Sequence, residues 1–296
     1  MSKDNLFEKV YYQYGMKKKL LFLLISTTLL ATGCKNNAAN KSANFLSQSK
    51  TVLTREEESI EQPTSTLVGD LEENDYYQLP VNLVCKLYSS KSYKAITLGS
   101  SETNVPLVGD VTQKIDALAI KGEYSYFYNS SSSSTYTSEH EAFYYNDQAV
   151  YKNKNDKKYT TSSLRNYLNK YGIFPFGLSI EGYKVSRSSI TSITKLPDEG
   201  DYYRFKIVFD KDKATNNVRI QMKALGDLTD YPVFSEIEMV LTIENDYTPI
   251  KIDFSAKYKA KKVVETSCHQ QYTVTYSQFG ETIDIPNLDN VKGLFN

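Results

Sequence analysis

Apolar and polar residues alternate most regularly in the last third of the chain. In segments 202–209, 236–244 and 250–258, apolar residues occupy every second position, and most residues between them are charged or carry hydroxyl groups. Successive side chains of a strand point to opposite faces, so each segment is predicted to be a strand with one apolar face. An Asn-Asp-Tyr-Thr-Pro turn at residues 245–249 joins the second segment to the third. The pattern predicts a curved antiparallel sheet whose other face is open to water.

Shorter apolar runs extend this sheet toward the N-terminus. A connection is expected at 105–111, which contains Pro106 and Gly109. The serine-rich tract 129–138 is interpreted as a hairpin tip, and residues 211–228 fit a strand and a helix equally well. The further predicted strands are 79–88, 93–98 (paired with 79–88), 115–128, the two sides of an Asn-Asp turn within 143–151, and 271–276.

One segment has the periodicity of a helix. In residues 162–171, Leu164, Tyr167, Leu168 and Tyr171 recur at the spacing that places apolar side chains along one side of a helix. Thr161 or Ser162 is expected to cap its start, and Gly172 to follow its end. The predicted fold class is therefore α+β, a curved antiparallel sheet in the form of a half-open barrel, covered by one or two helices.

The start of the chain has the layout of an export signal. Three lysines at 17–19 precede an apolar run at 20–31, and Thr32, Gly33 and Cys34 follow. The run is too short to span a bilayer as a helix. The segment resembles a bacterial lipoprotein signal, which implies cleavage between Gly33 and Cys34 and lipidation of Cys34. Translation is expected to begin at Met16, because residues 1–15 are unlike the basic start of a signal.

The resulting organisation has three parts. Residues 1–33 are the signal peptide, residues 34–75 are the lipidated cysteine with a disordered polar tether, and residues 76–296 are a single β-rich domain. A chain of this kind is anchored to the extracytoplasmic face of the cell membrane by its lipid. Oligomeric state is left open.

Charge and residue usage exclude several classes of function. Without residues 1–33 the chain has 30 basic and 33 acidic residues, which gives no basic face for a nucleic-acid partner. No metal site or cofactor is expected, because the chain has only two histidines. Catalytic motifs are also missing, so no catalytic residue is assigned and no enzyme activity is expected. Cys85 and Cys268 could form a disulfide or remain two buried thiols, and the sequence leaves both open.

The end of the domain carries a family resemblance. The stretch from Tyr272 to Pro286, with Phe279, Gly280 and Ile285, resembles the ending common in the lipoprotein carrier superfamily, which includes LolA, LolB and lipoproteins of the LppX and LprG type. The resemblance covers residues 76–290. It implies a half-open antiparallel barrel closed by helices that holds acyl chains in an apolar cavity. The chain departs from the pattern in its serine-rich insertion and in lacking a clear second covering helix.

Two functions follow as hypotheses. In the first, the half-barrel binds an apolar ligand such as lipid acyl chains, although the same side chains could form a dry packed core. In the second, tyrosine-rich exposed faces, such as Tyr124, Tyr126 and Tyr128, recognise protein or glycan. The residues expected to line the cavity are Phe205, Ile207, Phe209, Ile237, Met239, Leu241, Ile252 and Phe254.

Overall fold

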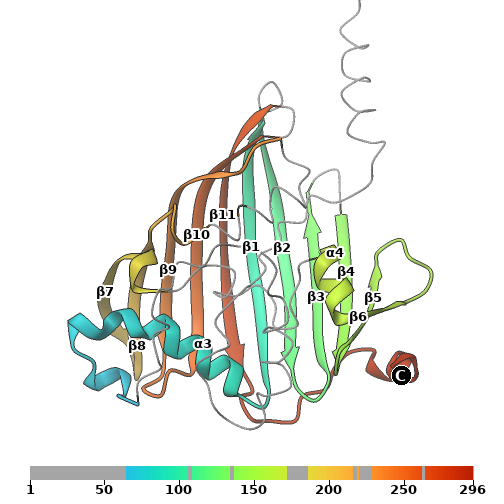
Figure 1. Cartoon of the computed structure of the whole chain (residues 1–296), viewed down its shortest axis with the longest axis horizontal. Helices are drawn as coiled ribbons and strands as arrows, with labels where there is room; N and C mark the ends of the chain where they lie inside the picture. The colour runs from blue at the N-terminus through green and yellow to red at the C-terminus, as the bar shows by residue number, and fades with distance from the viewer. Residues whose placement is uncertain are drawn as a thin grey trace, which may run out of the picture.

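The chain folds around one large antiparallel sheet that does not close (Figure 1). The computed structural model describes residues 65–105, 109–133, 137–171, 186–215, 219, 229–261 and 264–295. Within these ranges eleven strands pair in the order β6-β5-β4-β3-β2-β1-β11-β10-β9-β8-β7. The strands are β1 (Tyr93–Val105), β2 (Gly109–Lys121), β3 (Ser125–Ser132), β4 (Thr137–Tyr145), β5 (Gln148–Asn153), β6 (Thr160–Ser163), β7 (Ile190–Glu199), β8 (Tyr202–Phe209), β9 (Val233–Ile243), β10 (Pro249–Lys261) and β11 (Glu265–Ser277).

The long pairing of β1 with β11 joins the two halves of the sheet. It runs from Lys94 opposite Ser277 to Asn104 opposite Ser267. Along the chain the remaining neighbours are hairpins, so β1 to β6 spread to one side and β11 back to β7 spread to the other. The α+β class with an open antiparallel sheet is therefore confirmed.

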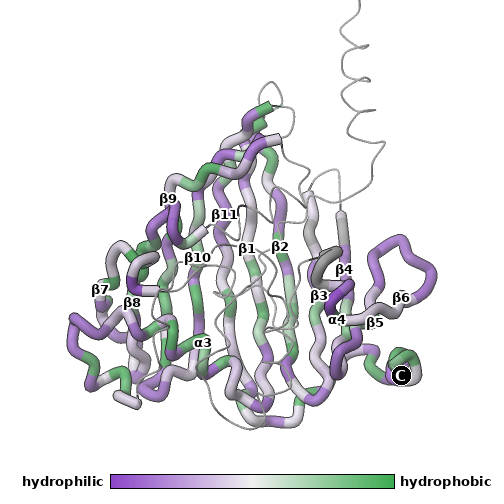
Figure 2. Tube along the Cα trace, in the orientation of Figure 1, coloured by the Kyte–Doolittle hydropathy of each residue, from purple (hydrophilic) through white to green (hydrophobic). Residues whose placement is uncertain are grey.

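The two described α-helices lie on the same face of the sheet, which we call the inner face (Figure 1). They are α3 (Leu79–Ser89) and α4 (Leu164–Tyr171). Apolar side chains of α3 and Tyr167 of α4 belong to one buried cluster with the strands. In Figure 2 apolar segments recur along β9 and β10, beside α3.

The strand predicted at residues 79–88 is wrong, because this segment is the helix α3. Leu79, Leu83 and Leu87 are four residues apart, so they fall on one side of a helix, and each is at most 1% exposed. Pro80 sits in the first turn, where its missing N–H costs no hydrogen bond. In a short window the same residues also fit an alternating pattern. Because residues 79–88 form a helix, β1 pairs with β2 and β11 instead of with this segment, and α3 supplies the second covering helix.

The other predicted elements are found with shifted limits. The single strand expected at 115–128 is two strands, β2 and β3, and the serine-rich tract belongs largely to β3 and β4. The turn within 143–151 is confirmed, with Asn146 at a φ of 50°. β6 continues to Ser163, so this residue caps α4 in place of Thr161 or Ser162: its Oγ accepts from the N–H of Asn166 at 3.3 Å. Gly172 and most of 211–228 lie outside the described residues.

The folded part begins before the predicted boundary at residue 76. Val68 is 2% exposed, and its N–H donates to the carbonyl oxygen of Asn245 at 2.9 Å. The Tyr247 hydroxyl donates to the carbonyl oxygen of Thr66 at 2.7 Å. Residues 65–75 therefore dock on the turn between β9 and β10. No α-helix in the described ranges is long and apolar enough to cross a membrane.

The C-terminal segment covers part of the opposite face, which we call the outer face. Val291 is fully buried in a second apolar cluster with side chains of β2 to β5. The Glu141 carboxylate fixes this arrangement, because it accepts hydrogen bonds from Tyr126 (3.1 Å), Tyr159 (2.7 Å) and Asn287 (3.0 Å). The outer face over β2 to β5 is therefore covered by the chain's own C-terminal segment.

Candidate functional site

The eight residues predicted to line a cavity do share one face. They lie on β8, β9 and β10, are all at most 3% exposed, and belong to the inner-face cluster. Phe254 stacks on Tyr272 of β11 with ring centroids 4.7 Å apart, and Tyr76 meets Phe205 edge-on at 5.0 Å. This side of the inner face is therefore a packed aromatic and aliphatic wall. Whether these residues contact a ligand stays a prediction.

The centre of the inner face carries small side chains, which we call the small-residue floor: Ala95, Thr97 and Gly99 of β1, and Ala117 and Ala119 of β2. Ala95 pairs with Ala119, and Thr97 pairs with Ala117. Both strands are buried here, although their side chains fill little volume. The floor is two strands wide, and neighbouring strands lie about 4.8 Å apart. The Ile-Asp-Ala-Leu-Ala-Ile alternation at 115–120 was the available sequence signal for it.

Large aromatic residues stand on both sides of the floor. On one side β11 presents Tyr272 and Tyr276, and on the other β3 presents Phe127 and β4 presents Tyr144. These four rings are at most 5% exposed. The inner face therefore has small side chains in the middle and large rings on both sides, an arrangement that we call the trough.

A buried polar chain ties α4 to the second wall. The Tyr144 hydroxyl donates to the Tyr167 hydroxyl at 3.1 Å, and His140 Nε2 lies 2.6 Å from that same hydroxyl. His140 Nδ1 lies 3.0 Å from Asn153 Oδ1 on β5. His140 is 1% exposed, so this chain holds the helix against the sheet with its polar atoms paired. Sequence reasoning assigned no role to His140.

Burial of tyrosine hydroxyls makes the fold sensitive to alkaline pH. Desolvation raises the pKa of Tyr272 and of Tyr144 well above the usual value near 10, although the Tyr167 hydrogen bond lowers the latter somewhat. Because the pKa of each tyrosine is raised in the folded state, its buried neutral hydroxyl contributes fully to the free energy of unfolding below pH ~10. That contribution is lost as the pH rises toward the folded-state pKa. Urea unfolding should lose up to about 1.4 kcal/mol per pH unit for each group above pH ~10. Tyr272→Phe should reduce the slope, and an unchanged slope would contradict this account.

A cavity of about 550 Å³ lies at the rim of the sheet, beside the end of α3. We call it the rim cavity. Lys86, Lys91, Glu244, Asp246 and Phe279 are among its lining residues. Lys86 Nζ and Asp246 Oδ2 form an ion pair at 2.6 Å, which joins α3 to the turn between β9 and β10. Partial burial raises the pKa of Asp246, but hydrogen bonds from Lys86 and Thr248 outweigh it, so the net shift is downward.

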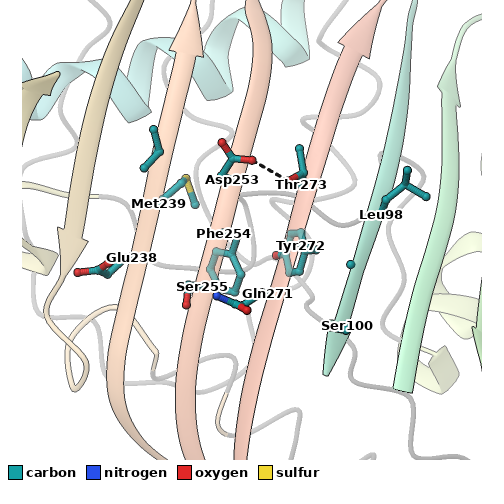
Figure 3. Close-up of a pocket in the computed structure, with 12 residues that line it drawn as sticks. Leu98, Ser100, Glu238, Met239, Asp253, Phe254, Ser255, Gln271, Tyr272 and Thr273 are labelled. Carbon is teal, nitrogen blue, oxygen red and sulfur yellow. Dashed lines mark hydrogen bonds between the residues drawn. The ribbon is translucent and has the colours of Figure 1, made fainter. Parts of the chain in front are cut away.

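A second hollow, of about 360 Å³, lies over β9, β10, β11 and β1 (Figure 3). Its polar lining residues, which include Asp253, Ser255, Gln271 and Thr273, belong to the outer face. Thr273 Oγ1 donates to Asp253 Oδ1 at 2.6 Å, the contact dashed in Figure 3. Leu98 is the exposed apolar residue at its edge, at 56%. This hollow has a mixed polar and apolar lining and lies on the outer face, so it is not the predicted apolar cavity.

Neither of the two cysteines, which were expected either to bridge or to remain thiols, is in a disulfide. Cys85 lies on α3, whereas Cys268 lies far along β11, where the Thr103 hydroxyl donates to its sulfur at 3.7 Å. Tyr276, which lines the rim cavity with Lys86, is eight residues further along β11, or ~26 Å of strand. Of the two alternatives, the structure therefore has the two separate thiols. Among the described residues, no three of the His, Cys, Asp and Glu side chains come together as metal ligands would.

The predicted exposed tyrosine face is wrong for its central member. Tyr126 is 4% exposed, and Tyr128 packs against the same cluster under the C-terminal segment. Tyr124 stacks on Tyr145 at 4.4 Å and contacts Phe295 at 5.6 Å. The three tyrosines do share a face, but the chain's own C-terminus covers it, so they do not form a free recognition surface.

No family model and no curated protein matches this chain. Among solved structures, it is similar to a DUF1329 family protein from Desulfovibrio piger, with 11% identity over 76% of this chain and 99% of that one, at a TM-score of 0.27. It is also similar to a LolA superfamily protein from Nitrosomonas europaea, with 12% identity over 72% of this chain and 96% of that one, at a TM-score of 0.24.

Proposed function

We propose that this protein is a lipid-anchored extracytoplasmic binding protein that holds the acyl chains of a lipid along its small-residue floor. The observation that carries the proposal is the trough shape of the inner face. Alanine, glycine and threonine on β1 and β2 have little side-chain volume, and the rings of β11, β3 and β4 stand on both sides of them. A long, narrow apolar ligand suits a lining of this kind, and burying its methylenes there is favourable by ~0.8 kcal/mol each.

The anchor supports the same proposal from the sequence. The segment at 17–34 resembles a lipoprotein signal, which supports a domain outside the cytoplasm, next to a bilayer that can supply acyl chains. Residues 65–75 dock on the turn between β9 and β10, so the tether reaches the domain at the rim. We propose binding without catalysis.

The test is to find bound lipid and then to fill the floor. The full chain is purified, extracted with organic solvent, and the extract is examined by mass spectrometry. We expect about one equivalent of lipid beyond the covalent anchor. Ala117→Phe should remove most of this lipid, because the ring occupies the space above β2. The matched control is Asp116→Phe, which adds the same ring on the exposed face of the same strand and should keep the lipid.

Stability separates this proposal from a dry core. If the space above Ala117 is already filled by protein, Ala117→Phe overpacks it and costs ~1–3 kcal/mol of unfolding free energy, and no lipid is found in either protein. If the space holds a ligand, the variant stays folded and only the lipid is lost. Absence of extractable lipid from the unmodified protein would contradict the proposal.

A further inference from the structure

We propose that the rim cavity holds the polar head of a zwitterionic amphiphile, such as a phosphoethanolamine head, and that the Phe279 ring closes the path from there to the inner face. This inference rests on the proposed function and names the site where its ligand enters and is selected. It has three parts: the position of Phe279, the backbone that presents it, and the charges around the cavity.

Phe279 lies at the boundary between the cavity and the apolar interior. The centroid of its ring lies 5.5 Å from that of Tyr93 and 6.4 Å from that of Tyr276. The ring centroids of Tyr93 and Tyr276 are 5.9 Å apart. Tyr93 is 1% exposed inside the inner-face cluster, against which Phe279 packs. Tyr276 and Phe279 also line the rim cavity. Tyr276 and Phe279 therefore form both part of the cavity wall and the end of the trough.

The backbone around Phe279 presents its ring from a tight turn. Gln278 and Gly280, on its two sides, have positive φ values of 58° and 75°. The turn is fixed to the start of β1, because the N–H of Gly280 donates to the carbonyl oxygen of Ser92 at 3.1 Å, and the Ser92 hydroxyl donates to the carbonyl oxygen of Glu281 at 2.7 Å. With the main chain held at these points, the ring can change rotamer while the strands stay in place.

The charges around the cavity fit a head with both signs. Four charged residues line it: Lys86 and Lys91, Glu244 and Asp246. Lys86 and Asp246 satisfy each other at 2.6 Å. The other two are exposed and available to bind a ligand: Lys91, on the loop after α3, and Glu244, directly after β9. A phosphate fits the ammonium of Lys91, and an ammonium fits the carboxylate of Glu244. Ile250 and Phe279 give the cavity an apolar side toward the interior.

The head-group part is tested by competition. The full chain is loaded with dansyl-aminoundecanoic acid, and the dye is displaced by lysophosphatidylethanolamine or by lysophosphatidylglycerol, which differ in the cationic group. The ethanolamine lipid should compete better by about fivefold, the value of one exposed ion pair. Glu244→Gln should abolish this preference, whereas Lys91→Met should weaken both lipids. Glu102→Gln, an exposed carboxylate on the outer face of β1, is the matched control and should change neither.

The gate part is tested by kinetics. In stopped-flow measurements Phe279→Ala should speed both loading and release of the dye by about tenfold and leave its equilibrium affinity nearly unchanged, because a gate alters rates more than affinities. Phe295→Ala removes the same side chain from the C-terminal segment on the outer face and should leave both rates unchanged. Circular dichroism verifies that each variant is folded, and the Lys91 and Glu244 variants alter exposed side chains that the core does not need.

The outcomes separate this inference from the proposed function. If the unmodified protein binds no dye and no lipid, both are overturned. If it binds, and either the Glu244→Gln preference or the Phe279→Ala rates stay as in the unmodified protein, the inference is overturned and lipid binding on the inner face stands. Loss of the ethanolamine preference together with accelerated exchange is the result that supports it.

Discussion

Replacing Gly99 by alanine should lower the unfolding free energy by at least about 3 kcal/mol, a large share of the 5–15 kcal/mol typical of a folded domain. Gly99 lies in β1, opposite Tyr272 of β11. A Cβ atom at this position would collide with the carbonyl oxygen of Gln271 and with Tyr272, whose Cα would be 2.5 Å away. Backbone atoms inside a paired strand cannot move aside cheaply, so the β1 and β11 pairing must open.

The effect should be visible in both stability and site geometry. Urea unfolding of the full chain gives the free energy, and near-ultraviolet circular dichroism should lose part of the signal from the stacked rings of Tyr272 and Phe254. Gly293→Ala is the matched control, because its added Cβ would meet no atom within 4 Å, and it should change stability by less than ~0.5 kcal/mol. Equal stability of the two variants would refute the close strand approach.

Replacing Cys34 by alanine should abolish acylation completely. The thiol of Cys34 is the proposed attachment point of the diacylglyceryl group, and alanine offers no atom to carry it. Cells fed an alkyne fatty acid should yield labelled protein from the unmodified gene and none from the variant. The same proposal predicts that residues 1–33 stay attached in the variant, which intact mass would show.

The two other cysteines provide the control for this experiment. Cys85→Ala and Cys268→Ala leave a thiol only at 34 and one domain position, and both should keep the full label, because the domain thiols lie on α3 and β11. Label that persists in Cys34→Ala, or disappears in either control, would contradict the assignment of the anchor.

The elements with strict periodicity were predictable. β8, β9 and β10 alternate so regularly that their buried set, from Phe205 to Phe254, could be named from the sequence, and all of it is on the inner face. Residues 79–88 were misassigned because a short apolar run fits strand and helix patterns alike, and only packing against the sheet selects the helix. The rim cavity could not be predicted, because Lys86, Glu244 and Phe279 come from segments that have no local relation to one another.

The tyrosines in and directly before β3 are a second example of this limit. Their spacing correctly placed Tyr124, Tyr126 and Tyr128 on one face, but no local pattern indicates that a C-terminal segment more than 150 residues later covers that face.

The sequence by itself determined the class of fold and the inward parity of the long strands, because each depends on residues close together in the chain. Tertiary structure alone decided that α3 is a helix, that small residues of β1 and β2 meet between aromatic walls, and that Phe279 stands between a charged cavity and the interior. These features depend on contacts between distant segments, and burial free energy over the whole sheet selects among them.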